Sequence, residues 1–197
     1  MLTGEKPDRE WRAPPALIRW NWPAGTQLTV RAVTNCDEVE LFLNDHSLGR
    51  HVVSHDIYAS DWTVAYAPGV LSAIAYRAGH KIAAQEIRTA GGPARLQLTP
   101  LVVPINSDLA LCEITVVDDA GLTVTDATPA VKVQVEGDSR LVGLDSGDLD
   151  YGGLFKTDSR FAYQGRLLAA VQRAAPGGLV RISATAPGLP AATALLP

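Results

Sequence analysis

Hydrophobic and polar residues alternate along most of this chain with a period of two. The clearest segments are residues 26–33, 37–43 and 130–137, and in the last of these Val131, Val133 and Val135 alternate with polar residues. Successive side chains of a strand point to opposite faces, so each segment has one face suited to burial and one suited to water. This pattern is typical of antiparallel sheets rather than of parallel sheets, which are buried on both faces.

Turn signals separate these segments at intervals that suit short strands. Examples are Asn44-Asp45, Pro68-Gly69 and Pro187-Gly188. No segment keeps an apolar stripe at helical spacing for three turns, and the nearest case, residues 164–174, reads equally well as a buried strand. The sequence therefore predicts an all-β fold built from antiparallel β-sandwiches of the fibronectin III or Ig-like kind.

A weak similarity between two segments of the chain predicts two such domains. Residues 67–79 and 175–188 share a Pro-Gly turn, an alternating strand and a second glycine turn. Between them, residues 89–94 contain Gly-Gly-Pro, which can neither pair in a sheet nor continue a helix and so favours a linker. The predicted parts are a flexible leader and two consecutive sandwich domains, at residues 1–13, 14–90 and 94–197.

Composition excludes several classes of partner. The 197 residues carry 17 basic and 21 acidic side chains, for a formal net charge of −4 without long runs of one sign, which argues against nucleic acid as a partner. No window approaches the roughly 18 consecutive apolar residues of a membrane span, so we expect a soluble protein with no membrane partner. Cys36 and Cys112 fall in different predicted domains and are interpreted as two separate free thiols.

The segment at residues 17–25, with sequence LIRWNWPAG, provides the candidate contact residues Trp20, Asn21 and Trp22. In a strand the two indoles would lie side by side on one face. Such rings can stack on sugars while an asparagine binds hydroxyl groups, or they can fill a core and an interface between domains, since each buries about 150–250 Å². We favour the interdomain contact and keep carbohydrate as the alternative partner.

Two long stretches resemble a known family. Residues 20–49 and 62–91 are similar to the β-sandwich that follows the catalytic barrel in a subgroup of family 2 β-galactosidases. Residues 141–148, 155–165 and 167–172 are similar to the Ig-like domain that comes next in those enzymes. The sequence departs from the family pattern at Arg19, Asp45 and Ser146, where a histidine, a glycine and an asparagine are expected.

The resemblance implies a non-catalytic C-terminal accessory region that serves as scaffold and docking unit of a β-galactosidase-like enzyme in carbohydrate metabolism. In that family both catalytic carboxylates belong to the barrel, and this sequence shows no alternating strand and helix units. We therefore expect no catalytic residues and no glycosidase activity from this chain alone. The expected partner is the catalytic barrel of a periplasmic or secreted parent, and the surface left exposed in its absence offers a site for self-association.

Two other functions remain as alternatives: an autonomous carbohydrate-binding module, and an Ig-like surface spacer or adhesin domain. Other chemistry is not indicated. His46, His51 and His55 are interpreted as solvated hairpin residues, because His51 and His55 would lie too far apart along a strand to share one metal. Asp145, Asp148 and Asp150 do not match a calcium loop and are interpreted as turn residues. We thus expect no metal site and no cofactor.

Overall fold

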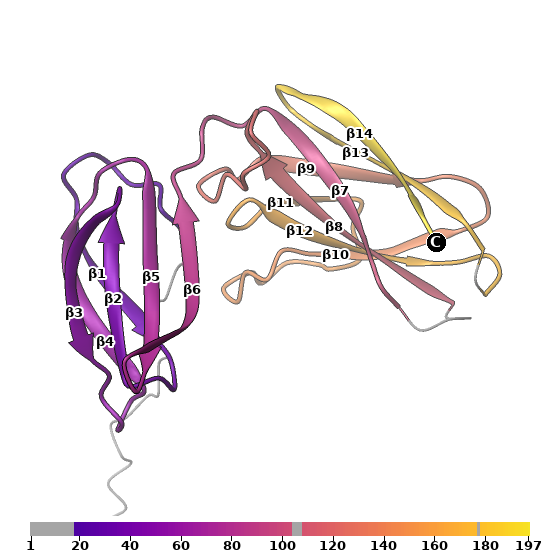
Figure 1. Cartoon of the computed structure of the whole chain (residues 1–197). Coiled ribbons are helices and arrows are strands. Elements are labelled where there is room, and N and C mark those ends of the chain that lie inside the picture. The colour runs from indigo at the N-terminus through magenta and orange to yellow at the C-terminus, as the bar shows by residue number, and fades with distance from the viewer. Residues whose placement is uncertain (1–17, 104–107, 177) are drawn as a thin grey trace, which may run out of the picture.

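A computed structural model describes residues 18–103, 108–176 and 178–197. These residues form fourteen strands and no helix (Figure 1). All the strand pairs are antiparallel, and the strands fall into two groups, β1–β6 and β7–β14, that share no sheet. The predicted fold class, two consecutive antiparallel β-sandwiches, is confirmed. The predicted leader at residues 1–13, with Trp11, lies outside the described residues.

The first sandwich packs a two-stranded sheet, β1-β4, against a four-stranded sheet of order β3-β2-β5-β6. The segments predicted at residues 26–33 and 37–43 are strands β1 and β2, with Leu28, Val39 and Leu41 facing inward. The bounds are β1 Gln27–Val33, β2 Glu38–Leu43, β3 His46–Val52, β4 Ala59–Ala65, β5 Val70–Arg77 and β6 His80–Arg88.

A two-residue turn joins β2 to β3. Its central residues, Asn44 and Asp45, both have positive φ, at 50° and 65°. Two consecutive positive φ values define a type I′ turn, whose twist matches that of the flanking strands. The Asn44 side chain reinforces the turn, since its Oδ1 accepts from the Val70 N–H and its Nδ2 donates to the Pro68 carbonyl. Asp45 therefore takes the left-handed geometry that asparagine and aspartate tolerate better than most residues.

The core of the first sandwich is rich in aromatic residues. Trp62 and Val64 lie on the inner face of β4, Tyr66 follows directly after its end, and all three are buried, as the alternation predicts. The Trp62 indole N–H donates to the Gly49 carbonyl at 3.3 Å, so its polar atom is satisfied inside the core. Cys36 is buried in the same cluster as a free thiol.

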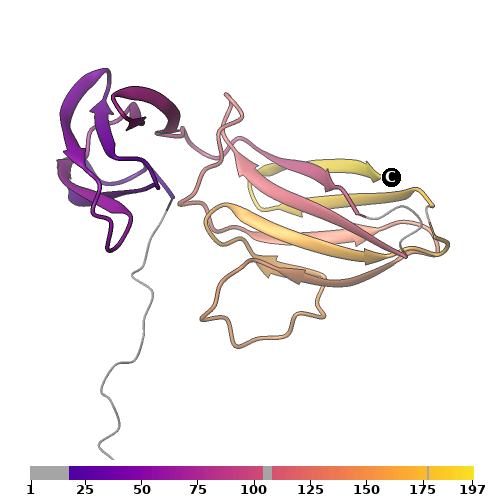
Figure 2. The ribbon, with the colours of Figure 1, turned by 60° about the horizontal axis from the view of Figure 1, so that its bottom comes forward.

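The second sandwich packs two four-stranded sheets, of order β10-β12-β8-β7 and β11-β9-β13-β14, face to face (Figures 1 and 2). The ambiguous segment at residues 164–174 is strand β12. The bounds are β7 Arg95–Leu101, β8 Leu109–Val117, β9 Ala130–Val135, β10 Arg140–Asp145, β11 Ser159–Phe161, β12 Arg166–Gln172, β13 Val180–Ala186 and β14 Leu189–Leu196.

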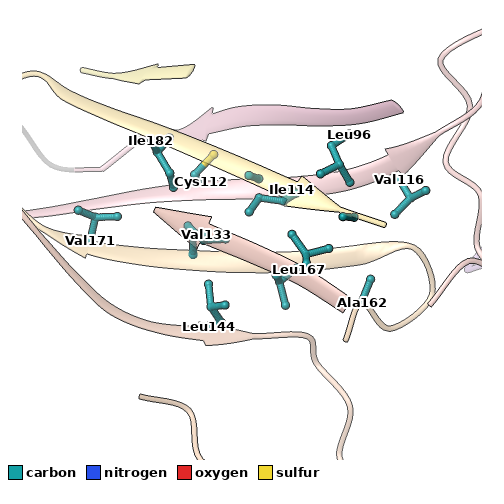
Figure 3. Packing of buried hydrophobic residues seen from close by; sticks show 14 of the residues in the cluster. Leu96, Cys112, Ile114, Val116, Val133, Leu144, Ala162, Leu167, Val171 and Ile182 are labelled. Carbon is teal, nitrogen blue, oxygen red and sulfur yellow. The ribbon is translucent and has the colours of Figure 1, made fainter. Parts of the chain in front are cut away.

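Aliphatic side chains from both sheets fill the second core. Ile114, Leu144, Leu167 and Ile182 point into the space between the sheets (Figure 3). Cys112 lies among them as a second free thiol, and burial raises its pKa to about 11, which keeps it protonated near neutral pH. Within the described ranges the chain forms no helix with the length and hydropathy of a membrane span.

Candidate interdomain site

The segment with Trp20, Asn21 and Trp22 is not a strand. Residues 18–23 approach the first sandwich as irregular chain, so the two indoles do not share a strand face. Trp20 is 2% exposed and lies in the first core, where its ring meets that of Tyr66 edge-on at 5.3 Å. Its indole N–H donates to the Ala67 carbonyl at 3.1 Å. Trp20 therefore anchors this segment to the sandwich through its buried ring and its bonded indole N–H.

Trp22 has a different environment from Trp20. It is only partly buried and packs against the outside of the same core. The Arg19 guanidinium lies 3.6 Å from the centre of its ring, which is a cation–π contact. Arg19, one of the departures from the family pattern, thus covers one face of this indole.

Asn21 connects the segment to a residue far along the chain. Its side-chain Nδ2 donates to the Ala90 carbonyl at 2.9 Å, and its Oδ1 accepts from the Ala90 N–H at 2.8 Å. This pair of hydrogen bonds satisfies both backbone groups of Ala90 in the way that a neighbouring strand would. The Asn21 amide is therefore engaged by the segment that joins the two sandwiches.

The residue before Ala90 is held by the first sandwich as well. The Thr89 N–H donates to the Gly69 carbonyl, and the Thr89 hydroxyl accepts from the Gly69 N–H at 3.0 Å. The same hydroxyl shares a hydrogen bond with the Tyr66 hydroxyl. Thr89 and Ala90 are thus bonded to the end of the first sandwich that carries Trp20.

The residue after Ala90 is held by the second sandwich. The Gly91 N–H donates to Oδ2 of Asp118 at 2.8 Å, while Oδ1 of the same carboxylate accepts from the Leu122 N–H at 2.8 Å. Asp118 is 5% exposed. The hydrogen bond from Gly91, followed by those from Leu122, Ala120 and Gly121, holds the pKa of Asp118 below its ordinary value.

We call residues 89–91, together with Asn21 and Asp118, the junction. Ala90 is its central residue, because its backbone is bonded to Asn21 while its side chain lies in the core of the second sandwich. The sequence did not single out Asp118. The available signal was its place two residues before the Ala120-Gly121 turn, where a carboxylate can accept from successive backbone N–H groups.

The predicted hairpin histidines do not converge. His46 begins β3, His55 lies beyond the end of β3, and the His51 ring stacks on Trp62 at 4.5 Å with an interplanar angle of 7°. Among the residues that the structure describes, no group of three histidine, cysteine or acidic side chains could hold a metal ion.

The acidic segment at residues 145–150 forms turns, as predicted. The Gly147 N–H donates to Oδ1 of Asp145, and the Asp150 N–H donates to Oδ1 of Asp148. Each bond spans two residues, which is the Asx-turn geometry.

Sequence reasoning also missed Arg160, which lies beneath this segment and is 3% exposed. Its guanidinium packs against the rings of Tyr151, at 3.7 Å, and Phe155, at 4.6 Å. Its Nη1 donates to the Leu144 carbonyl, and its Nε donates to the Ser146 hydroxyl. A buried cation thus organises residues 145–155, which expose the almost fully accessible Leu149.

Two surface depressions lie on the second sandwich. The larger, of about 430 Å³, is lined mainly by proline and small residues, including Pro93, Pro129 and Pro187. The other, of about 370 Å³, is lined by residues that include Asp158 as its one acidic side chain. Neither lining contains the pair of carboxylates that a retaining glycosidase uses.

Family comparisons agree with the two-sandwich architecture. Residues 25–83 match a family described as a domain of unknown function, DUF4982, and residues 104–194 match glycoside hydrolase family 2 C-terminal domain 5. The chain is 28% identical to a family 2 glycosyl hydrolase from Bacteroides cellulosilyticus, whose solved structure superimposes with a TM-score of 0.86 over 98% of this chain and 27% of that one.

Two curated proteins are among those similar in sequence. Beta-galactosidase BoGH2A of Bacteroides ovatus is 33% identical over 174 residues, which are 86% of this chain and 20% of that protein. A beta-glucuronidase of Formosa agariphila is 31% identical over 120 residues, or 56% of this chain and 12% of that protein. The chain thus spans no more than a fifth of the length of these relatives.

The fold defines the class as a tandem of antiparallel β-sandwich domains. Within that class, the chain corresponds to the C-terminal β-sandwich and Ig-like domains of family 2 glycoside hydrolases.

Proposed function

We propose that this chain is a non-catalytic scaffold and docking region of a β-galactosidase-like family 2 glycosidase that acts in carbohydrate metabolism. The supporting observation is that the match to the Bacteroides ovatus β-galactosidase runs through both sandwiches, over 86% of the chain. Matches to a β-glucuronidase and a putative β-glucuronidase of Formosa agariphila cover 56% and 80% of the chain, at the lower identities of 31% and 28%. The described residues form strands only, so they supply none of the helices of a (β/α)₈ barrel.

We propose further that the catalytic barrel packs against the surface around Trp22. Trp20 lies inside the core and the Asn21 amide is engaged at Ala90, so Trp22 is the candidate whose side chain is left for a partner. Arg19 and Trp22 present a stacked cation and ring, and both residue types are enriched in the buried centres of protein interfaces. Without that partner, the same surface is available for self-association.

A protein contact suits this surface better than a sugar. A pyranose would need an open ring face and nearby groups that bind hydroxyls. Arg19 covers one face of Trp22, and the Asn21 amide is already bonded in both directions.

The first step is to sequence the DNA on the 5′ side of the Met1 codon, where we expect a catalytic barrel to be encoded. The barrel is then expressed alone and together with the present chain. The chain should co-elute with the barrel in size-exclusion chromatography, and it should raise the Tm of the barrel. Trp22→Ala should weaken this association at least tenfold. Tyr58→Ala is the matched control, because Tyr58 is an exposed aromatic beyond the opposite end of β4.

Three results would contradict the proposal. The first is the absence of a barrel from the upstream sequence, and the second is hydrolysis of an aryl β-galactoside by the purified chain. The third is binding of the chain to a glycan array at micromolar affinity with loss of binding in Trp22→Ala, which would favour the carbohydrate-binding module.

A further inference from the structure

We propose that the junction fixes the orientation of the two sandwiches, so that they move as one body rather than as two domains on a flexible linker. The composition of the linker points the other way, because Gly91 and Gly92 impose little restriction on the backbone. The proposal depends on the contacts of the junction alone and not on the proposed function.

The first sandwich holds its side of the junction through an anchored side chain. Asn21 follows Trp20, whose ring is buried and whose indole N–H is bonded to Ala67, so the position of Asn21 is set by the core. From there it bonds to both the N–H and the carbonyl of Ala90. Thr89 adds its own backbone and hydroxyl bonds to Gly69.

The second sandwich holds its side through a methyl group and a carboxylate. The Ala90 side chain lies in the second core, and the Gly91 N–H is bonded to Asp118. Asp118 is itself fixed by the Leu122 N–H, and its neighbour Val117 accepts from the Ala94 N–H where β7 begins. The contacts with the second sandwich therefore begin at Ala90, the residue at which the contacts with the first sandwich end.

No freely rotating residue separates the part of the junction bonded to the first sandwich from the part bonded to the second. The N–H groups of Thr89, Ala90 and Gly91 are bonded, the first two to the first sandwich and the third to the second. Rotation about the backbone of Ala90 would break the bonds to Asn21 or the bond to Asp118, and it would also withdraw the Ala90 methyl group from the second core. The connection between β6 and β7 (Figure 1) is thus held by contacts with both sandwiches, and these contacts prevent it from acting as a hinge.

Nuclear magnetic resonance of the full chain tests this proposal. Residual dipolar couplings should give one common alignment tensor for β1–β6 and β7–β14 in the wild-type chain. Asn21→Ala should speed hydrogen exchange of the Ala90 amide at least tenfold and should make the two tensors diverge. Asn21→Asp keeps an acceptor for the Ala90 N–H but loses the donor to the Ala90 carbonyl. The Ala90 amide in this variant should therefore exchange faster than in the wild-type chain and more slowly than in Asn21→Ala.

Asn35→Ala serves as the control, because Asn35 bonds to Arg77, away from the junction. It should leave the tensors and the Ala90 exchange rate unchanged. Continued protection of the buried Val39 and Ile182 amides verifies that both cores remain folded in each variant. Different tensors in the wild-type chain, or unchanged Ala90 exchange in Asn21→Ala, would overturn the proposal, and neither outcome bears on whether a catalytic barrel binds.

Discussion

Trp20 and Trp22 are two positions apart in sequence, yet they differ in what their indoles contact. The first lies in the core with its N–H bonded, while the second is partly exposed beneath Arg19. We expect Trp20→Ala to destabilise the first sandwich by about 3–5 kcal/mol, the usual cost of removing a large buried aromatic. Trp22→Ala should cost roughly 1 kcal/mol, since surface changes rarely cost more.

Urea unfolding followed by tryptophan fluorescence measures this difference. The described tryptophans all belong to the first sandwich, and Trp62 stays as the reporter in both variants. Equal losses of stability in the two variants would show that Trp20 is not the anchor that its burial indicates.

Asp45 offers a second prediction at a single residue. Its φ of 65° strains an L-residue by about 1 kcal/mol, and glycine adopts this conformation without that strain. Asp45→Gly should therefore stabilise the first sandwich by about 0.5–1 kcal/mol in the same urea assay. Ser72→Gly, in the middle of β5, is the control and should destabilise it. A loss of stability in Asp45→Gly would mean that the aspartate makes a contribution larger than the strain.

At the scale of elements, Arg160 holds residues 145–155 against β10 through its two ring contacts and its bonds to Leu144 and Ser146. Arg160→Lys keeps the charge but loses the planar guanidinium that stacks and donates in several directions. We expect chymotrypsin to cleave at the exposed Leu149 or Phe155 at least tenfold faster. Arg166→Lys, on the exposed side of β12, should leave cleavage unchanged. Similar cleavage in wild type and Arg160→Lys would contradict this role.

The strands were predictable from sequence because alternation is a local property. Residues 26–33, 37–43 and 130–137 carry it within themselves, and the structure has β1, β2 and β9 there. The junction was not predictable in the same way, because Asn21 and Ala90 are 69 residues apart and are joined by a side chain bonding to a backbone. Local patterns contain no signal for such a pair. The sequence pattern indicated that Asn21 makes a contact but not that its partner is Ala90.

For the whole molecule, the junction bears on where one domain ends and the next begins. A boundary at residue 94 leaves Ala90 and Gly91 outside the second domain, yet Ala90 lies in that core and Gly91 bonds to Asp118. We expect a chain of residues 90–197 to be more stable than one of residues 94–197 by about 1–2 kcal/mol, from one buried methyl group and one charge-assisted hydrogen bond. Urea unfolding followed by far-UV circular dichroism compares them, and equal stability would favour the boundary at residue 94.

Asp118 gives the molecule a specific response to acid. Its pKa is lowered chiefly by the Gly91 N–H, so the unfolded chain takes up a proton at a higher pH than the folded one. Its contribution to stability is therefore complete above the unfolded pKa of about 3.9 and is lost as the pH falls through the lower folded value. Arg95 lies nearby and donates to the Asp118 backbone carbonyl rather than to its carboxylate.

Asp118→Asn separates this effect from general acid unfolding. The amide can still accept one hydrogen bond, but it carries no charge at any pH. The wild-type chain should be the more stable of the two at pH 6, and the difference in free energy of unfolding should shrink steadily as the pH is lowered from about 4 towards 2. Exchange of the Gly91 amide should follow the same course, because its partner is the group that titrates. A difference that stays constant with pH would show that the Asp118 carboxylate holds the junction through its shape rather than its charge.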